Sequence, residues 1–225
     1  MSETAARRSS KADHVYDDLK ESILSGALVP GGAIDKLEIC ERLGVSRFPV
    51  SAAINRLAYE RLVTIEPQRG SFVARISIDD VRERLLVRRA LESEIAAQAA
   101  ARMPTEGVEG LERNLRYQQA AVDGSDVAGF YLLDVDFHRL LTTRLGLGQC
   151  GEILDGLRSH LERVRRLLLT PAGRMPVSLS EHSAITAAIA RRDAAGARAA
   201  MEFHLQQTTT LFESFARERS GLFSR

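Results

Sequence analysis

Asp134 and His138 place ionisable side chains on an otherwise apolar helix face. They are four residues apart in a predicted helix near 126–146, so both lie on one face, one turn apart. That face also carries apolar residues at helical spacing, namely Phe130, Leu133, Phe137, Leu141 and Leu145. Burying such polar groups is costly unless they are hydrogen-bonded or coordinated. The pair therefore predicts a partner inside the protein, and a carboxylate with an imidazole suits a shared metal ion.

Two further histidines interrupt the apolar faces of predicted helices near 179–192 and 194–218. His182 and His204 are 22 residues apart, with a turn near Arg192–Asp193 about midway between them. If these helices run antiparallel, a rise of ~1.5 Å per residue brings both imidazoles to nearly the same height. Three imidazoles and one carboxylate could then bind one Zn, Ni, Co, Fe or Mn ion. Hydrogen bonding among four polar core residues is the alternative.

Arg88, Glu92 and His160 are candidates for a ligand pocket beside these groups. Arg88 and Glu92 share the inner face of a predicted helix near 79–102. Arg88 either forms a fork with a carboxylate ligand or is neutralised by Glu92 as a structural pair. His160 lies on the apolar stripe of a predicted helix near 151–169, where it either lines the same cavity or binds the ion.

The composition is that of an ordinary globular protein, with 44% apolar and 27% charged residues. No apolar run approaches the ~20 residues that span a bilayer, and the polar N-terminus does not resemble a signal peptide. Cys40 and Cys150 form no metal motif and fit a reducing compartment. We therefore expect a cytoplasmic protein without a membrane role. A net charge of +1 does not by itself indicate nucleic-acid binding, so that function must be argued from local pattern.

The first part of the chain has the element order of a winged helix-turn-helix. Three helices and a hairpin are predicted, over Val15–Ser25, Lys36–Leu43, Ser46–Leu62, Val63–Ile65 and Ser71–Val73. Further helices are predicted near 79–102, 106–122, 126–146, 151–169, 179–192 and 194–218. We therefore expect a disordered arm at 1–13, a winged helix-turn-helix at 14–76 and an all-α bundle at 77–225. The fold class is mainly α.

The third helix and the hairpin carry the candidate DNA contacts. A recognition helix points its N-terminal residues into the major groove. Arg47 is the first candidate reader, because arginine binds guanine O6 and N7 together. The other candidates are Ser46, Pro49, Ser51, Asn55 and Arg56 on the helix, and Arg69 and Gly70 at the wing tip.

The run VYDDLKESILSGALVPGG, followed by LEICERLGVSRFPVSAAINRLAYERLV and PQRGSFVA, resembles the DNA-binding domain of the GntR family of regulators. The resemblance spans about 15–75. This chain departs from the family in carrying Phe48 where Thr is usual, and Ser51-Ala52 where Arg-Glu is usual. The family arginine at position 51 commonly touches DNA. Its absence leaves Arg47 and Arg56 as the expected readers.

The rest of the chain, from VRRALESEIAAQAA through DVDFHRLL to SEHSAITAAIARRDAAGARAAMEFHLQQT, resembles the FCD ligand-binding domain. The resemblance covers roughly 80–215. The metal ligands of that family fall on Asp134, His138, His182 and His204, the same four residues reached above. The resemblance implies a homodimer, a bound divalent metal, and an organic-acid effector that completes the metal's coordination.

These patterns lead us to expect a transcription regulator rather than an enzyme. It would bind double-stranded operator DNA as a homodimer, in our interpretation as a repressor, and respond to a small carboxylate at a metal site. One alternative is the same role with a metal-free pocket. Another is a helical metalloenzyme, but Glu181 is expected to point away from His182, which leaves no evident general base.

Overall fold

The structure, a computed structural model, describes residues 10–169 and 173–224, apart from the side chains of residues 159, 160, 167 and 169. The chain divides into two compact units. The first contains the residues up to Ile76 together with Gly221–Ser224, and the second contains Ser77–Ser220. Each unit has its own hydrophobic core. Among the described helices, none is both long enough and apolar enough to cross a membrane.

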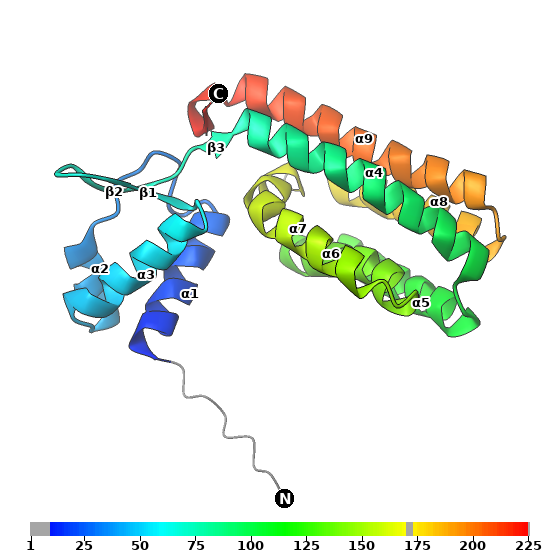
Figure 1. Cartoon of the computed structure of the whole chain (residues 1–225), viewed down its shortest axis with the longest axis horizontal. Coiled ribbons are helices and arrows are strands. Elements are labelled where there is room, and N and C mark those ends of the chain that lie inside the picture. Colours follow the sequence, from blue (N-terminus) through cyan, green and yellow to red (C-terminus); the bar gives the residue numbers. More distant parts are fainter. Residues whose placement is uncertain (1–9, 170–172, 225) are drawn as a thin grey trace, which may run out of the picture. The chain divides into compact units, whose positions relative to one another are not determined.

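The first unit is a winged helix-turn-helix (Figure 1). Its main elements are α1 (Lys11–Leu24), α2 (Lys36–Leu43), α3 (Arg47–Tyr59), β1 (Val63–Glu66) and β2 (Gly70–Val73). The wing is the antiparallel β1–β2 pair, in which Val63 lies opposite Val73. A second small sheet pairs β3 (Ile76–Ser77) with β4 (Phe223–Ser224), which follows the short helix η1 (Ser220–Leu222). The predicted inner stripe of the third helix is buried, at Val50, Ala53, Ile54 and Leu57.

The first helix begins earlier than the sequence pattern indicated. Ser10 caps α1, because its hydroxyl accepts a hydrogen bond from the backbone N–H of Asp13 and the Asp13 carboxylate accepts one from the backbone N–H of Ser10. This reciprocal pair satisfies two N–H groups that a helix start leaves unpaired. Residues 10–13 are therefore ordered and do not belong to the expected arm, whose remaining residues, 1–9, lie outside the described part.

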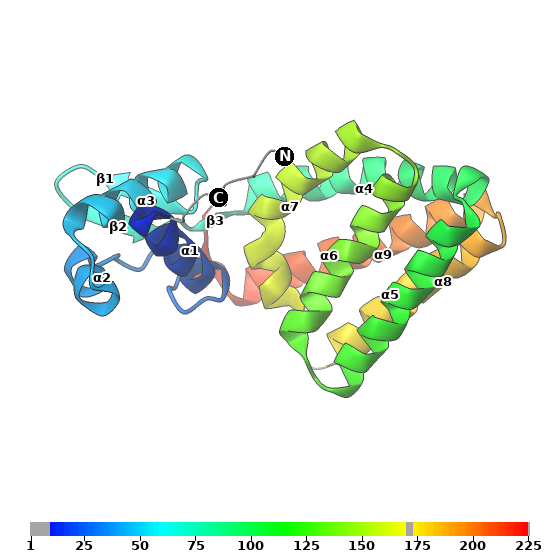
Figure 2. The same ribbon diagram turned by 90° about the horizontal axis from the view of Figure 1, so that it is seen from below.

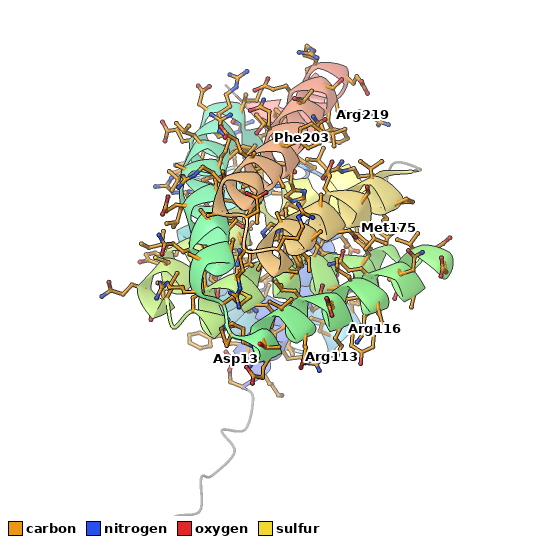
Figure 3. The ribbon with its side chains drawn as sticks, turned by 90° about the vertical axis from the view of Figure 1, so that its right-hand side faces the viewer. Asp13, Arg113, Arg116, Met175, Phe203 and Arg219 are labelled. Carbon is orange, nitrogen blue, oxygen red and sulfur yellow. The ribbon has the colours of Figure 1, made fainter. Side chains whose placement is uncertain are left out.

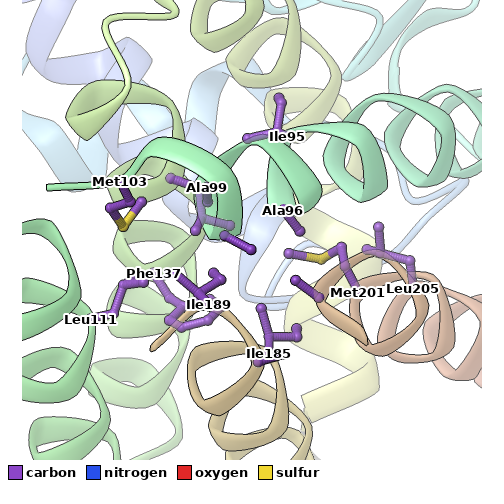
Figure 4. Close-up of a cluster of buried hydrophobic side chains, with 14 of the residues drawn as sticks. Ile95, Ala96, Ala99, Met103, Leu111, Phe137, Ile185, Ile189, Met201 and Leu205 are labelled. Atoms are coloured by element: carbon purple, nitrogen blue, oxygen red, sulfur yellow. The ribbon is translucent and has the colours of Figure 1, made fainter. Parts of the chain in front are cut away.

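The second unit consists of long helices that pack side by side (Figures 1 and 2). They are α4 (Ile78–Arg102), α5 (Thr105–Asp123), α6 (Val127–Arg144), α7 (Gly148–Leu169), α8 (Arg174–Ala190) and α9 (Ala194–Glu218). Helices α4 and α9 lie along each other, as do α8 and α9, and α5 and α6. The core between α4, α8 and α9 is built from apolar side chains of different shapes, including Ala96, Ala99, Ile185, Ile189 and Met201 (Figure 4).

Charged and polar side chains cover the outer faces of this bundle, where Arg113 and Arg116 of α5 stand exposed to solvent (Figure 3). Helix α8 starts at Arg174, five residues before the predicted start at 179. Pro176 does not prevent this early start, because it lies in the first turn, where backbone N–H groups have no intrahelical acceptor. The early start matters for the site, because it brings Arg174 onto α8.

Candidate metal centre and nucleic-acid interface

The four predicted metal ligands come together inside the helical unit. Asp134 and His138 come from α6, His182 from α8 and His204 from α9, and all four side chains are buried. One potential ligand atom from each residue lies within 4.8 Å of those of the other three. The antiparallel arrangement of α8 and α9 places His182 and His204 side by side, with ring centroids 4.7 Å apart. A single ion could therefore contact all four residues.

Each imidazole has a polar partner close to its Nδ1 atom, a hydrogen-bond acceptor for His182 and His204 and an ion-pair contact for His138. His138 Nδ1 lies 2.5 Å from Glu92 Oε2, and His182 Nδ1 lies 2.8 Å from Gln118 Oε1. His204 Nδ1 lies 2.6 Å from a carboxylate oxygen, Oε2 of the neighbouring Glu181. Metal-binding histidines characteristically use their second nitrogen in this way, which fixes the ring and leaves the other nitrogen for the metal.

The Nε2 atoms of His138 and His182 are buried and have no hydrogen-bond partner within the described part of the chain. They lie 3.9 Å and 3.5 Å from Asp134 Oδ1, too far for a hydrogen bond. A buried nitrogen without a partner costs free energy, which a coordinated ion would remove. Three imidazoles and one carboxylate are also a donor set that divalent transition metals accept. The residues present therefore fit the metal that the sequence predicted.

Burial keeps the three imidazoles in their neutral, metal-binding form. It lowers the pKa of His182 and of His204 well below the ordinary value, with a smaller contribution from the nearby positive charges. Burial also lowers the pKa of His138, although Glu92 opposes that shift. A neutral imidazole is the form that donates a lone pair to a metal.

Glu92 lies at the centre of a network of buried charged side chains. Its Oε1 atom accepts a hydrogen bond from Arg88 Nε at 2.7 Å, and its Oε2 atom faces His138 and, at 3.5 Å, Arg158. Burial alone would raise the pKa of Glu92, but Arg88, His138 and Arg158 together hold it well below its usual range. Glu92 is therefore a structural partner of Arg88, as one of the two alternatives proposed, and it also orients His138.

A cavity of about 30 Å³ adjoins the cluster. It is lined by Arg88, Asp134, Arg165, Arg174, Ser178 and His204, among others. Arg88 lines it, and the buried Nη2 atom of Arg88 has no hydrogen-bond partner among the described residues. The Arg165 guanidinium contacts Asp134, and Arg174 donates to Glu181 at 3.0 Å. The wall is therefore rich in arginine. His160 was also expected here, but its side chain lies outside the described part.

The sequence pattern did not identify two arginines of the cavity, Arg165 and Arg174, or two residues that position the imidazoles, Gln118 and Glu181. Arg165 falls four residues after Leu161 and three before Leu168, so a polar interruption of an apolar stripe could have identified it, as it did His138. Gln118 gives the same pattern on α5. Glu181 was expected only to point away from His182; it is buried and contacts His204 instead, because α8 has helices on more than one side and buries adjacent residues.

Some of the predicted DNA-contacting residues are exposed on the surface, whereas others are buried or already paired within the unit. Ser46, Arg47 and Asn55 are exposed at the start and along the outer face of α3, and Ser51 is half-buried. Ser46 occupies the N-cap by its backbone, but its hydroxyl accepts no capping bond from the described helix. Pro49 is buried, so it shapes the first turn of the helix and offers no surface to a ligand.

Arg56 faces α1 and is already paired. Its Nη1 atom donates to Asp13 Oδ1 at 2.6 Å, and its guanidinium lies over the Tyr16 ring, 3.9 Å from the centroid. This pairing leaves Arg47 as the exposed arginine at the start of the helix. At the wing tip, Arg69 bonds Glu66 at 2.5 Å, and Gly70 adopts a positive φ of 118° that favours glycine.

Comparison with known proteins agrees with both units. The model of the family "Bacterial regulatory proteins, gntR family" matches residues 11–73, and that of the FCD domain matches residues 83–207. The chain is 31% identical over 210 residues to the HTH-type transcriptional repressor RspR of Escherichia coli K12, covering 93% of this chain and 92% of that protein. The chain belongs to the GntR family. Its FCD domain places it with the FadR/VanR-like members of that family.

Other GntR regulators are similar along most of their length. An HTH-type transcriptional regulator of Streptomyces ambofaciens is 32% identical over 206 residues, covering 92% of this chain and 85% of the relative. Escherichia coli McbR/YncC has the same fold, with a TM-score of 0.71, 21% identity and coverage of 91% and 98%. GntR regulators bind operator DNA, and FCD domains are known to bind metals. This chain is thus a DNA-binding transcription regulator with a buried Asp and His cluster in its FCD domain.

Proposed function

We propose that this GntR regulator is a repressor that binds operator DNA as a homodimer and is controlled by a small carboxylate metabolite. The observation that carries the control site is the convergence of Asp134, His138, His182 and His204 on one buried point. The name of the similar RspR protein, a transcriptional repressor, supports the mode of action. A dimer is expected because a two-fold protein matches the two half-sites of a typical operator.

A divalent transition metal, one of Zn, Ni, Mn, Co and Fe, would be held by these four residues. When bound, it supplies open coordination positions for carboxylate oxygens. The residues behind the imidazoles determine how well the site holds an ion. Glu92, Gln118 and Glu181 each contact one of the three rings, so these contacts set the orientation of the donor atoms.

The arginines of the cavity favour an anionic ligand. Arg88, Arg165 and Arg174 all line it, and a guanidinium can bind a carboxylate through two parallel hydrogen bonds. A volume of about 30 Å³ holds only water-sized groups. A metabolite therefore enters only if a side chain moves. Arg165 is the best candidate, because it contacts Asp134 and its movement would free the Asp134 carboxylate.

Two of the helices that carry this site are connected in the chain to the DNA-binding unit. Helix α4 carries Arg88 and Glu92 and follows β3 in the chain, while α9 carries His204 and leads through η1 to β4. Strands β3 and β4 pair with each other. A ligand that binds one arrangement of α4 and α9 more tightly than another would change the population of DNA-binding conformations.

Metal content tests the first part of this proposal. Elemental mass spectrometry on tag-free protein should find about one equivalent of transition metal in the wild type. The His182→Ala/His204→Ala variant should retain none, whereas His14→Ala, which changes a histidine on α1, should retain the wild-type amount. If no metal binds even after soaking with Zn, Ni and Mn, the coordination model fails and the cavity becomes a metal-free polar pocket.

Thermal unfolding with a panel of mono-, di- and tricarboxylates tests the second part. A carboxylate that raises the melting temperature of the wild type should also change its affinity for DNA, measured by fluorescence anisotropy. The Arg165→Ala variant should lose that response while it keeps its DNA affinity in the absence of ligand. If every carboxylate leaves both melting temperature and DNA affinity unchanged, the proposed effector class is wrong.

A further inference from the structure

Two exposed aromatic side chains lie on helix α3. Tyr59 is 92% exposed and Phe48 is 82% exposed, whereas the next most exposed large hydrophobic side chain described in the structure, Leu132, is 62% exposed. Both aromatics therefore stand almost fully in water on one helix of 13 residues. Single exposed apolar side chains are common on protein surfaces. These two, however, lie on the helix that enters the DNA groove in this family, so they could contact DNA.

Phe48 occupies the end of α3 that would approach the bases. It is the second residue of the helix and follows the exposed Arg47. Phe48, Ala52, Asn55 and Tyr59 are spaced by four, three and four residues, so they form one outward stripe. Eleven residues separate the two aromatics, which corresponds to ~16 Å along the helix axis. Only the N-terminal part of a recognition helix reaches base edges, so Phe48 is placed to do so and Tyr59 is not.

The chemistry of the major groove specifies what a phenyl ring can read there. Three of the four bases present only hydrogen-bond donors and acceptors on that side, whereas thymine adds an apolar C5-methyl group. A phenylalanine side chain has no polar atom, so it gains free energy only from the methyl group. Moreover, the nearby Arg56 is directed toward Asp13 and Tyr16, so it does not extend over this end of the stripe.

We propose that Phe48 is a specificity-determining residue that selects thymine in the operator by packing its ring against the C5-methyl group. The base pair concerned adjoins the one that Arg47 contacts. This inference rests on operator binding, but it is independent of the metal and of the effector. It predicts that the preferred operator of this protein contains a thymine that a polar residue at position 48 would not select.

The experiment compares DNA with and without that methyl group. Full-length wild-type protein selects its preferred sequence from a pool of random DNA duplexes, and each thymine of the selected duplex is then replaced singly by deoxyuridine. We expect one thymine per half-site at which the replacement weakens wild-type binding by about fourfold, the effect of one buried methyl group, ~0.8 kcal/mol. At that position, Phe48→Ala should bind the thymine and deoxyuridine duplexes equally.

Tyr59→Ala provides a matched control, because it removes the other highly exposed aromatic, from the far end of the same stripe. This variant should keep the fourfold sensitivity. The proposal is overturned if no single replacement affects the wild type, or if Phe48→Ala remains sensitive at the same thymine. It is also overturned if Phe48→Ala changes only the oligomeric state in analytical ultracentrifugation, since the ring then contacts a second copy of the chain. A protein that selects no sequence at all contradicts operator binding itself.

Discussion

The buried site of the helical unit and the exposed face of α3 use charged side chains in opposite ways. In the buried site, the carboxylates beside the imidazoles are each paired with an arginine, Glu92 with Arg88 and Glu181 with Arg174. On α3, Arg47 stands exposed in water with no such network described around it, while Arg56 one turn from the helix end is tied to α1. The difference follows from desolvation, because a buried charge needs compensation within the protein and an exposed one is compensated by water.

The comparison implies that disturbing the buried network has the largest effect on stability. Replacing Glu92 by Ala leaves Arg88 buried without its carboxylate and leaves Arg158 with Asp155 as its remaining carboxylate partner. We expect a loss of about 3–5 kcal/mol in the free energy of unfolding. Urea denaturation in the presence of a chelator measures this loss without a metal contribution. Glu94→Ala on the same helix, which removes an exposed carboxylate, should leave the value nearly unchanged.

A smaller effect is expected when a positioning residue is removed without leaving a charge unpaired. Gln118→Ala removes the acceptor that holds His182 and should lower metal affinity by about 10–100-fold. Competition with a chelator of known affinity measures the change. Gln119→Ala, at the neighbouring exposed position, is the control and should bind metal as the wild type does. Equal metal affinity for the two variants would show that Gln118 does not orient the ligand.

On the exposed face, the two arginines of α3 should behave differently. Arg47→Ala should weaken specific DNA binding by ~1–3 kcal/mol if the guanidinium reads a base, with the fold of the unit unchanged. Arg56→Ala should instead affect mainly the stability of the first unit, and only slightly, because the Asp13 pair is solvent-exposed. Anisotropy titrations and thermal unfolding of both variants separate the effects. If Arg56→Ala weakened DNA binding more than Arg47→Ala does, Arg56 would have to leave Asp13 to contact DNA.

The smallest effect concerns the start of α1, and it depends on pH. Hydrogen bonds from Ser10, together with that from Arg56, lower the pKa of Asp13 from 3.8 to about 2. The resulting stabilisation is fully present above pH 4 and is lost as the pH falls toward 2, because the folded state holds the charged form. The stability difference between the wild type and Asp13→Asn should therefore shrink below pH 4 in urea titrations. A difference that stays constant down to pH 3 would contradict this assignment.

Much of the fold could be predicted because its elements are encoded locally. Apolar residues at helical spacing predicted the long helices, and Gly70 between two β-prone runs predicted the wing. The boundaries were less accurate at 10–13, where a capping box starts α1 before the apolar pattern, and at 174–178, where the first turn of α8 accommodates Pro176. Both errors arise because hydrogen bonding at a helix start does not depend on hydrophobicity.

The four candidate ligands could be found in the sequence because a polar residue in an apolar stripe must be buried, and equal distance from a turn gives equal height in antiparallel helices. The sequence by itself therefore determined which residues point inward. Only the tertiary structure decided which side chains meet there, as it did for Gln118, Glu181 and Arg165, and that Arg56 bonds Asp13 across 43 residues of chain. The physical reason is that helical periodicity fixes the direction of a side chain relative to its own helix. Pairing between helices depends on their packing, which no local pattern specifies.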